Sequence, residues 1–62
     1  MAYTSRQTYK VVAVFEDRRK VLGSRVGAFK AARMAEQINA KGLTAEVIPN
    51  GGGDTVTYAL ED

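Results

Sequence analysis

The chain has no cysteine and no histidine among its 62 residues. Without cysteine it can form neither disulfides nor thiolate zinc sites, and without histidine it lacks the commonest metal ligand and the commonest general base. Its longest apolar run, Val11–Phe15, is far shorter than the roughly 20 residues of a membrane span. The polar, mixed N-terminus does not match a signal peptide. We therefore expect one small domain, a complete cytoplasmic product with no membrane partner.

Neither catalysis nor metal binding is indicated by the residues that are present. Ser5 and Ser24 have no histidine to activate them. The seven acids show neither the spacing of a paired carboxylate site nor a calcium-loop pattern. The run 51–53 is glycine-rich, but it lacks the Gly-Lys-Ser or Gly-Lys-Thr ending of a phosphate loop and leads into a predicted strand. We expect a protein that is not an enzyme and that uses no cofactor or metal.

The first half of the chain predicts a β-hairpin. Residues 1–7 are polar and are expected to form a flexible N-terminal arm, followed by a single domain over residues 8–62. Residues 8–15 are rich in β-branched and aromatic side chains, which is typical of a strand. Residues 20–22 predict a short return strand that ends near Gly23, so the two strands should pair antiparallel.

One helix is predicted by the alanine-rich segment 29–40. Its start is open between Arg25 and Lys30, with Ser24 as a candidate N-cap, and Gly42 stands where a left-handed terminator is expected. At 100° per residue, small and apolar side chains gather on one side of this helix and polar ones on the other. The helix should therefore lie close against a sheet.

Two further strands are predicted after the helix. Residues 43–49 and 55–60 alternate in strand fashion, and the flexible loop 50–54 joins them. The predicted fold is α+β, with the order hairpin-helix-hairpin (ββαββ), and one helix lies on one face of a four-stranded antiparallel or mixed sheet. Phe15 and Tyr58 are the natural fillers beneath the helix.

The first predicted strand is apolar on both of its faces. Tyr9 points to one face with Phe15, whereas Val12 and Val14 point to the other. A single helix covers only one face, so a second copy, the arm or another protein would have to cover the other. The alternative is that exposed valines only reflect strand propensity. We name Val12, Val14 and Tyr9 as candidate protein-interface residues and expect a homo-oligomer, most simply a homodimer.

Charge is distributed unequally along the chain. Residues 1–33 hold eight cations and two acids, for a net charge of +6, while residues 34–62 hold one cation and five acids, for a net charge of −4. Clustered cations are typical of surfaces that contact nucleic-acid phosphates, although an ordinary solvated surface is the alternative. The candidate nucleic-acid-binding residues are Arg6, Lys10, Arg18, Arg19, Lys20, Arg25, Lys30 and Arg33. Exposed aromatics could add base stacking, with Tyr3 and Tyr9 as the better candidates.

A family resemblance covers the middle of the chain. Val26-Gly27-Ala28-Phe29, the helical Ala35-Glu36 and the stretch Ala40–Pro49 together resemble half of a SPOR domain. That family binds peptidoglycan glycan strands stripped of stem peptides, so the resemblance implies a glycan-binding sheet surface. The chain departs from the family because the second half is missing, Leu43 replaces an aromatic residue and no secretion signal is present. No binding residues are transferred.

Three functions follow from these observations. The first is a small non-enzymatic module that binds nucleic acid through the basic hairpin and the exposed helix face. The alternative is an accessory or inhibitor protein of the phage or mobile-element type, which acts by binding a host protein and is expected to be a homo-oligomer. The third, a module that binds cell-wall glycan, rests on the resemblance alone.

Overall fold

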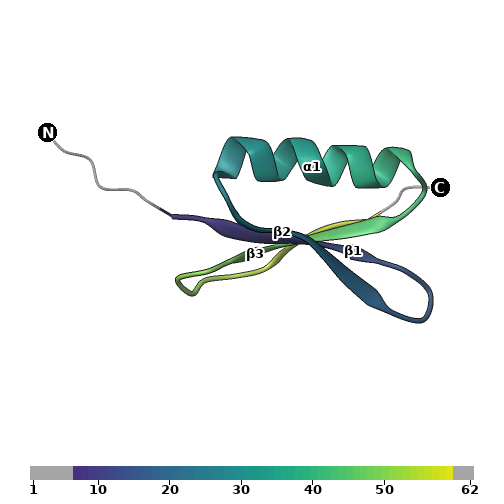
Figure 1. Ribbon diagram of the computed structural model, residues 1–62, viewed down its shortest axis with the longest axis horizontal. Coiled ribbons are helices and arrows are strands. Elements are labelled where there is room, and N and C mark those ends of the chain that lie inside the picture. The colour runs from purple at the N-terminus through teal and green to yellow at the C-terminus, as the bar shows by residue number, and fades with distance from the viewer. Residues whose placement is uncertain (1–6, 60–62) are drawn as a thin grey trace, which may run out of the picture.

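Two β-hairpins flank one helix and combine into a single four-stranded antiparallel sheet (Figure 1). The computed structural model describes residues 7–59. Its elements are β1 (Tyr9–Val14), β2 (Arg19–Val26), α1 (Ala28–Ala40), β3 (Thr44–Pro49) and β4 (Val56–Tyr58). This arrangement confirms the predicted α+β fold with the order ββαββ. Residues 1–6 of the expected arm, and Leu60 of the expected last strand, lie outside the described residues.

β2 is longer than predicted. The return strand was expected to end near Gly23, but it continues to Val26. Gly23 pairs with Val11 inside the ladder, and a Cβ placed on it would lie 3.2 Å from the Met34 Cε. This glycine therefore makes room for the helix rather than ending the strand. Two register shifts between β1 and β2 accommodate the extra length.

The prediction that Ser24 caps the helix is wrong for the same reason. Ser24 lies within β2, and its carbonyl accepts a hydrogen bond from the Asn50 side-chain amide at 2.9 Å. The N-cap is Gly27, which has no side-chain oxygen to offer, and α1 begins at Ala28. At the other end, Gly42 adopts a φ of 85°. Its amide and that of Leu43 bond to the carbonyls of Asn39 and Ile38, which is the Schellman pattern that a glycine here predicts.

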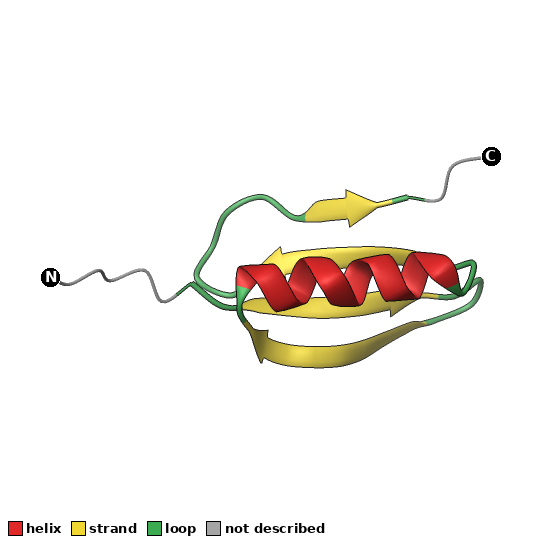
Figure 2. Ribbon diagram, turned by 90° about the horizontal axis from the view of Figure 1, so that it is seen from above, coloured by secondary structure: helices red, strands yellow, loops and turns green. Residues whose placement is uncertain are grey.

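The strand order β2-β1-β3-β4 keeps each hairpin on its own half of the sheet. β1 pairs antiparallel with both β2 and β3, so β2 and β3 run parallel to each other with β1 between them. Helix α1 connects β2 to β3 and lies over the middle of the sheet, leaving β2 and β4 at the two edges (Figure 2).

The core lies between α1 and one face of the sheet and is built from small side chains. The buried cluster consists of Val11, Ala13, Ala31, Ala35, Ile38, Ala45 and Val47. Four of these seven residues are alanine, which allows the helix backbone to approach the central strands closely. Phe15 and Tyr58 pack at the borders of the cluster, as predicted.

This close approach predicts that the buried face of α1 does not tolerate larger side chains. Ala35 is fully buried, so Ala35→Leu should lower the free energy of unfolding by about 1–3 kcal/mol through overpacking. Ala40 is exposed on the same helix, and Ala40→Leu should change that free energy by less than about 0.5 kcal/mol. Urea denaturation followed by circular dichroism measures both. Equal effects of the two variants would contradict the close packing.

Candidate nucleic-acid interface

The charge difference between the two halves of the sequence becomes a difference between the two sides of the sheet. The first hairpin occupies the β2 side and carries Arg18, Arg19, Lys20 and Arg25, all of them exposed. Lys10 lies on β1. The other half of the sheet carries Glu46 on β3 and Asp54 in the loop that leads to β4. The positive and negative side chains, which occupy different parts of the sequence, therefore also lie on different halves of the sheet.

The helix repeats this separation on its two flanks. Met34 approaches Gly23, so its flank of α1 lies above β2. Asn39 donates from Nδ2 to the Tyr58 carbonyl at 2.9 Å, so the opposite flank lies above β4. At 100° per residue, Lys30 falls on the flank of Met34, and Glu36 falls on the flank of Asn39. Lys30 thus stands on the side of β2, whereas Arg33 points away from the sheet, between Lys30 and Glu36.

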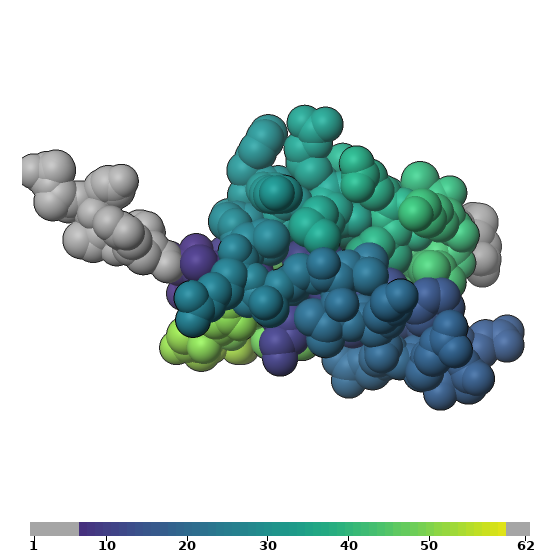
Figure 3. Space-filling view, in the orientation of Figure 1, coloured from purple at the N-terminus to yellow at the C-terminus, as the bar shows by residue number. Residues whose placement is uncertain are grey.

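We call this surface the basic side; it comprises Arg18, Lys20, Arg25, Lys30, Arg33 and Lys41. All six residues are exposed. Figure 3 shows the molecule from this direction, with residues of β2 and α1 in front. Within residues 7–59, Asp17 directly precedes Arg18 in the turn of the first hairpin, and Glu36 lies three residues after Arg33 on α1. The field is therefore weaker at the hairpin tip and beside Arg33 than around Lys20, Arg25 and Lys30.

Two of the arginines stack on aromatic rings. The Arg18 Cζ lies 5.0 Å from the centroid of the Phe15 ring, and the Arg33 Cζ lies 5.9 Å from that of Phe29. Phe29 is 77% exposed. Such cation–π contacts orient a guanidinium while leaving its N–H groups free to donate. Each of these two guanidinium groups is thus placed against the ring of a nearby phenylalanine.

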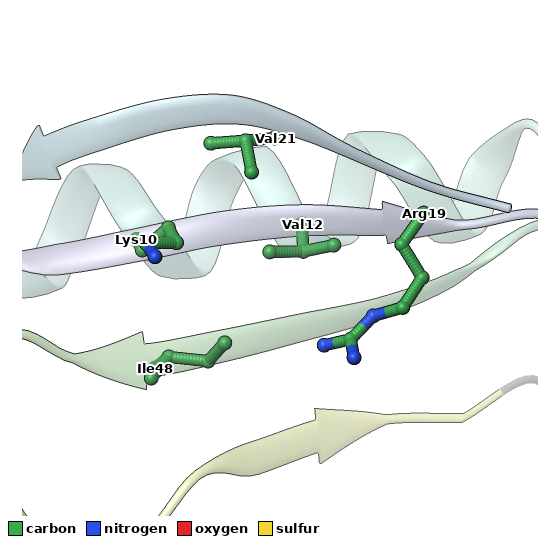
Figure 4. Close-up of a pocket in the computed structure, with 5 residues that line it drawn as sticks. All are labelled: Lys10, Val12, Arg19, Val21 and Ile48. Carbon is green, nitrogen blue, oxygen red and sulfur yellow. The ribbon is translucent and has the colours of Figure 1, made fainter.

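Arg19 is placed differently from the other cations of the first hairpin. Its side chain passes over β1 and pairs with Glu46 on β3 (Figure 4). Its charge is thereby offset on the face of the sheet that α1 leaves open. Lys10 lies on this open face as well. Of the predicted nucleic-acid residues, Arg19 and Lys10 thus stand apart from the basic side, and Arg6 lies outside the described residues.

The open face also holds the predicted apolar strip. A shallow depression of about 280 Å³ is lined by Lys10, Val12, Arg19, Val21 and Ile48 (Figure 4). Val12, at its centre, is only 3% exposed, and Val14 is half-buried. The sequence reasoning missed Val21 and Ile48, because only the register shows that Val21 pairs with Val12 and that Ile48 pairs with Lys10.

The aromatic residues of the strands lie away from this open face. Tyr9, Phe15 and Tyr58 all pack against the core beneath the helix. Tyr9 is therefore separated by the sheet from Val12 and Val14, with which it was grouped as an interface residue. In the part of the chain that the structure describes, the strands offer no aromatic platform on the open face for stacking bases. Tyr3 lies outside the described residues.

Neither a metal-binding cluster nor a membrane-spanning helix is found within residues 7–59. There, no three acidic side chains gather closely enough to hold a metal ion. Over the same residues, no helix has the length and apolarity to cross a membrane. No family model, no curated protein and no solved structure matches the chain. The resemblance of residues 26–49 to half of a SPOR domain therefore stays a prediction from the sequence.

Proposed function

We propose that the protein binds nucleic acid through its basic side. The observation that carries this proposal is the separation of charge across the sheet, which gathers six exposed cations from β2, its hairpin and α1 on one side of the molecule. Lysine and arginine bind nucleic acid by displacing counterions from phosphates, and this contribution requires no sequence readout. Separation of the signs makes the field directional, so a polyanion is drawn to one side only.

The basic side contacts phosphates rather than base edges. Eight residues of β2 span about 23 Å at 3.3 Å per residue, which is long enough to follow several phosphates of a backbone. Lys30 and Arg33 form a second row of cations on α1. Phosphate contacts position a protein without specifying a sequence, so binding with little sequence preference is expected.

The hairpin tip contributes less than the strand behind it. Glu16 and Asp17 are exposed in the turn, and their charges oppose an approaching phosphate. The centre of contact is therefore β2 together with the neighbouring helix flank. This placement differs from binding by a hairpin that inserts its tip into a groove.

The dependence of affinity on salt tests this proposal. If about six phosphates are neutralised on duplex DNA, the log–log slope should be near −5. Lys20→Ala and Lys30→Ala should each make that slope shallower by about 0.9, since each removes one contact. Lys10→Ala removes the same charge from the open face and should leave the slope unchanged. Fluorescence anisotropy with a labelled duplex measures all four slopes.

Two results would overturn the proposal. One is the absence of binding to duplex or single-stranded nucleic acid at about 50 mM salt, where the electrostatic contribution is large, by a protein whose circular dichroism shows it to be folded. The other is an equal change of slope in Lys10→Ala and Lys20→Ala, because the contact would then not be confined to the basic side.

A further inference from the structure

Phe29 is an aromatic residue that does not contribute to the core. Three other aromatic side chains lie within residues 7–59, and all of them pack against the core beneath the helix: Tyr9, Phe15 and Tyr58. Phe29 lies in the first turn of α1 and is 77% exposed. At 100° per residue, its side chain points to the side of the helix opposite the buried Ile38. The packing of the described fold therefore does not account for this ring.

The surroundings of the Phe29 ring are cationic. The Arg33 Cζ lies 5.9 Å from the ring centroid, and Lys30 is the next residue of the helix. Arg25 stands on β2, three residues before α1 begins. The first turn of α1 contains no acid, and Glu36, the one acid of the helix, lies about 10 Å further along the axis. A flat apolar ring thus lies in a region of positive potential.

A single ring bordered by cations differs from a docking surface for another protein. Such docking surfaces are contiguous apolar patches, on the order of several hundred Å². The residues three and four positions after Phe29 are its neighbours on the helix surface, and they are Ala32 and Arg33. Since Arg33 approaches one face of a ring that is largely exposed, the other face remains open. An aromatic ring beside cations is instead typical of surfaces that bind unpaired nucleotides, where a base stacks on the ring and phosphates contact the cations.

We propose that Phe29 stacks on an unpaired base, so that the preferred ligand of the basic side is single-stranded nucleic acid. This inference rests on the proposed function, since phosphates of the same strand contact Lys30 and the cations of β2. In a duplex each base is stacked between its neighbours, and its face is not accessible to a side chain. Every base has a face that can stack, so this contact adds affinity with little sequence preference.

The surface offers a strand a continuous path from this ring to β2. Around the helix, Lys30 lies between Phe29 and Met34, and the Met34 side chain lies above β2. Arg25 lies at the end of β2 from which the chain enters α1. A base stacked on Phe29 therefore places its neighbouring phosphates near Lys30 and Arg25. From there the backbone of the ligand can continue along β2 toward Lys20.

Fluorescence anisotropy with three labelled ligands tests the stacking. The ligands are an oligothymidylate of about 12 nucleotides, an abasic strand of the same length and a duplex of the same length. Phe29→Leu should weaken binding of the oligothymidylate by at least about fivefold, because it keeps an apolar side chain but removes the ring. It should leave binding of the abasic strand and of the duplex unchanged, since no charge is lost. Phe29→Tyr is the matched control: it keeps the ring and should bind all three ligands as the wild type does.

Tryptophan fluorescence gives a second readout of the same contact. The chain contains no tryptophan, so Phe29→Trp introduces a single reporter at the position of the ring. Stacking on a base should quench its emission when the oligothymidylate binds, and the abasic strand should quench it much less. Val56→Trp is the control, because Val56 is 52% exposed on β4, at the opposite edge of the sheet from β2. Its emission should not respond to either strand. Circular dichroism checks that all variants fold.

Three results would overturn this inference and leave the proposed function standing. The first is unchanged affinity of Phe29→Leu for the oligothymidylate, with a salt slope that still depends on Lys20. The second is equal weakening of Phe29→Leu toward the oligothymidylate and the duplex, because Phe29 would then act only by orienting Arg33. The third is binding of the oligothymidylate to Phe29→Trp without quenching. Absence of binding to every one of the three ligands would instead overturn this inference together with the proposed function.

Discussion

A single 13-residue helix covers one face of a four-stranded sheet, and the remaining features of the protein follow from this limit. The buried cluster lies between α1 and the sheet, where it includes Ala31 and Ala35 of the helix with Ala13 and Ala45 of the strands. The opposite face carries apolar strand residues but has no helix over it. Arg19 and Glu46 pair across β1 and so place a polar group on this face beside Val12.

The order of the strands converts the difference in charge between the two halves of the sequence into a difference in charge between the two sides of the sheet. Each hairpin stays on its own half of the sheet, so within residues 7–59 the Arg19–Glu46 pair is the one ion pair between a cation of the first hairpin and an acid of the second. Helix α1 reinforces the separation, because Lys30 stands above β2 while Glu36 stands on the flank toward β4. The proposed binding of nucleic acid rests on this asymmetry, because it draws a polyanion to one side of the molecule.

The sequence predicted local structure well and placement across strands poorly. Alternation in β1, the alanine face of α1 and the terminator Gly42 each act within a few residues, so the fold class and the core could be read directly. The length of β2 could not be predicted, because the need for glycine at position 23 depends on Met34, which is far away in the sequence. The pairing of Arg19 with Glu46 was equally hidden, because it depends on the register of three strands. For the same reason the predicted basic cluster divided between the basic side and the open face.

The central claim is that the basic side, and no other surface, meets nucleic acid. Titration of the ¹⁵N-labelled protein with a short DNA duplex, followed by amide chemical shifts, tests it most directly. We predict that the largest shift changes fall on β2 and on the α1 flank that carries Lys30, while β3 and β4 change little. Largest changes on β3 or β4, or no changes at low salt, would contradict it.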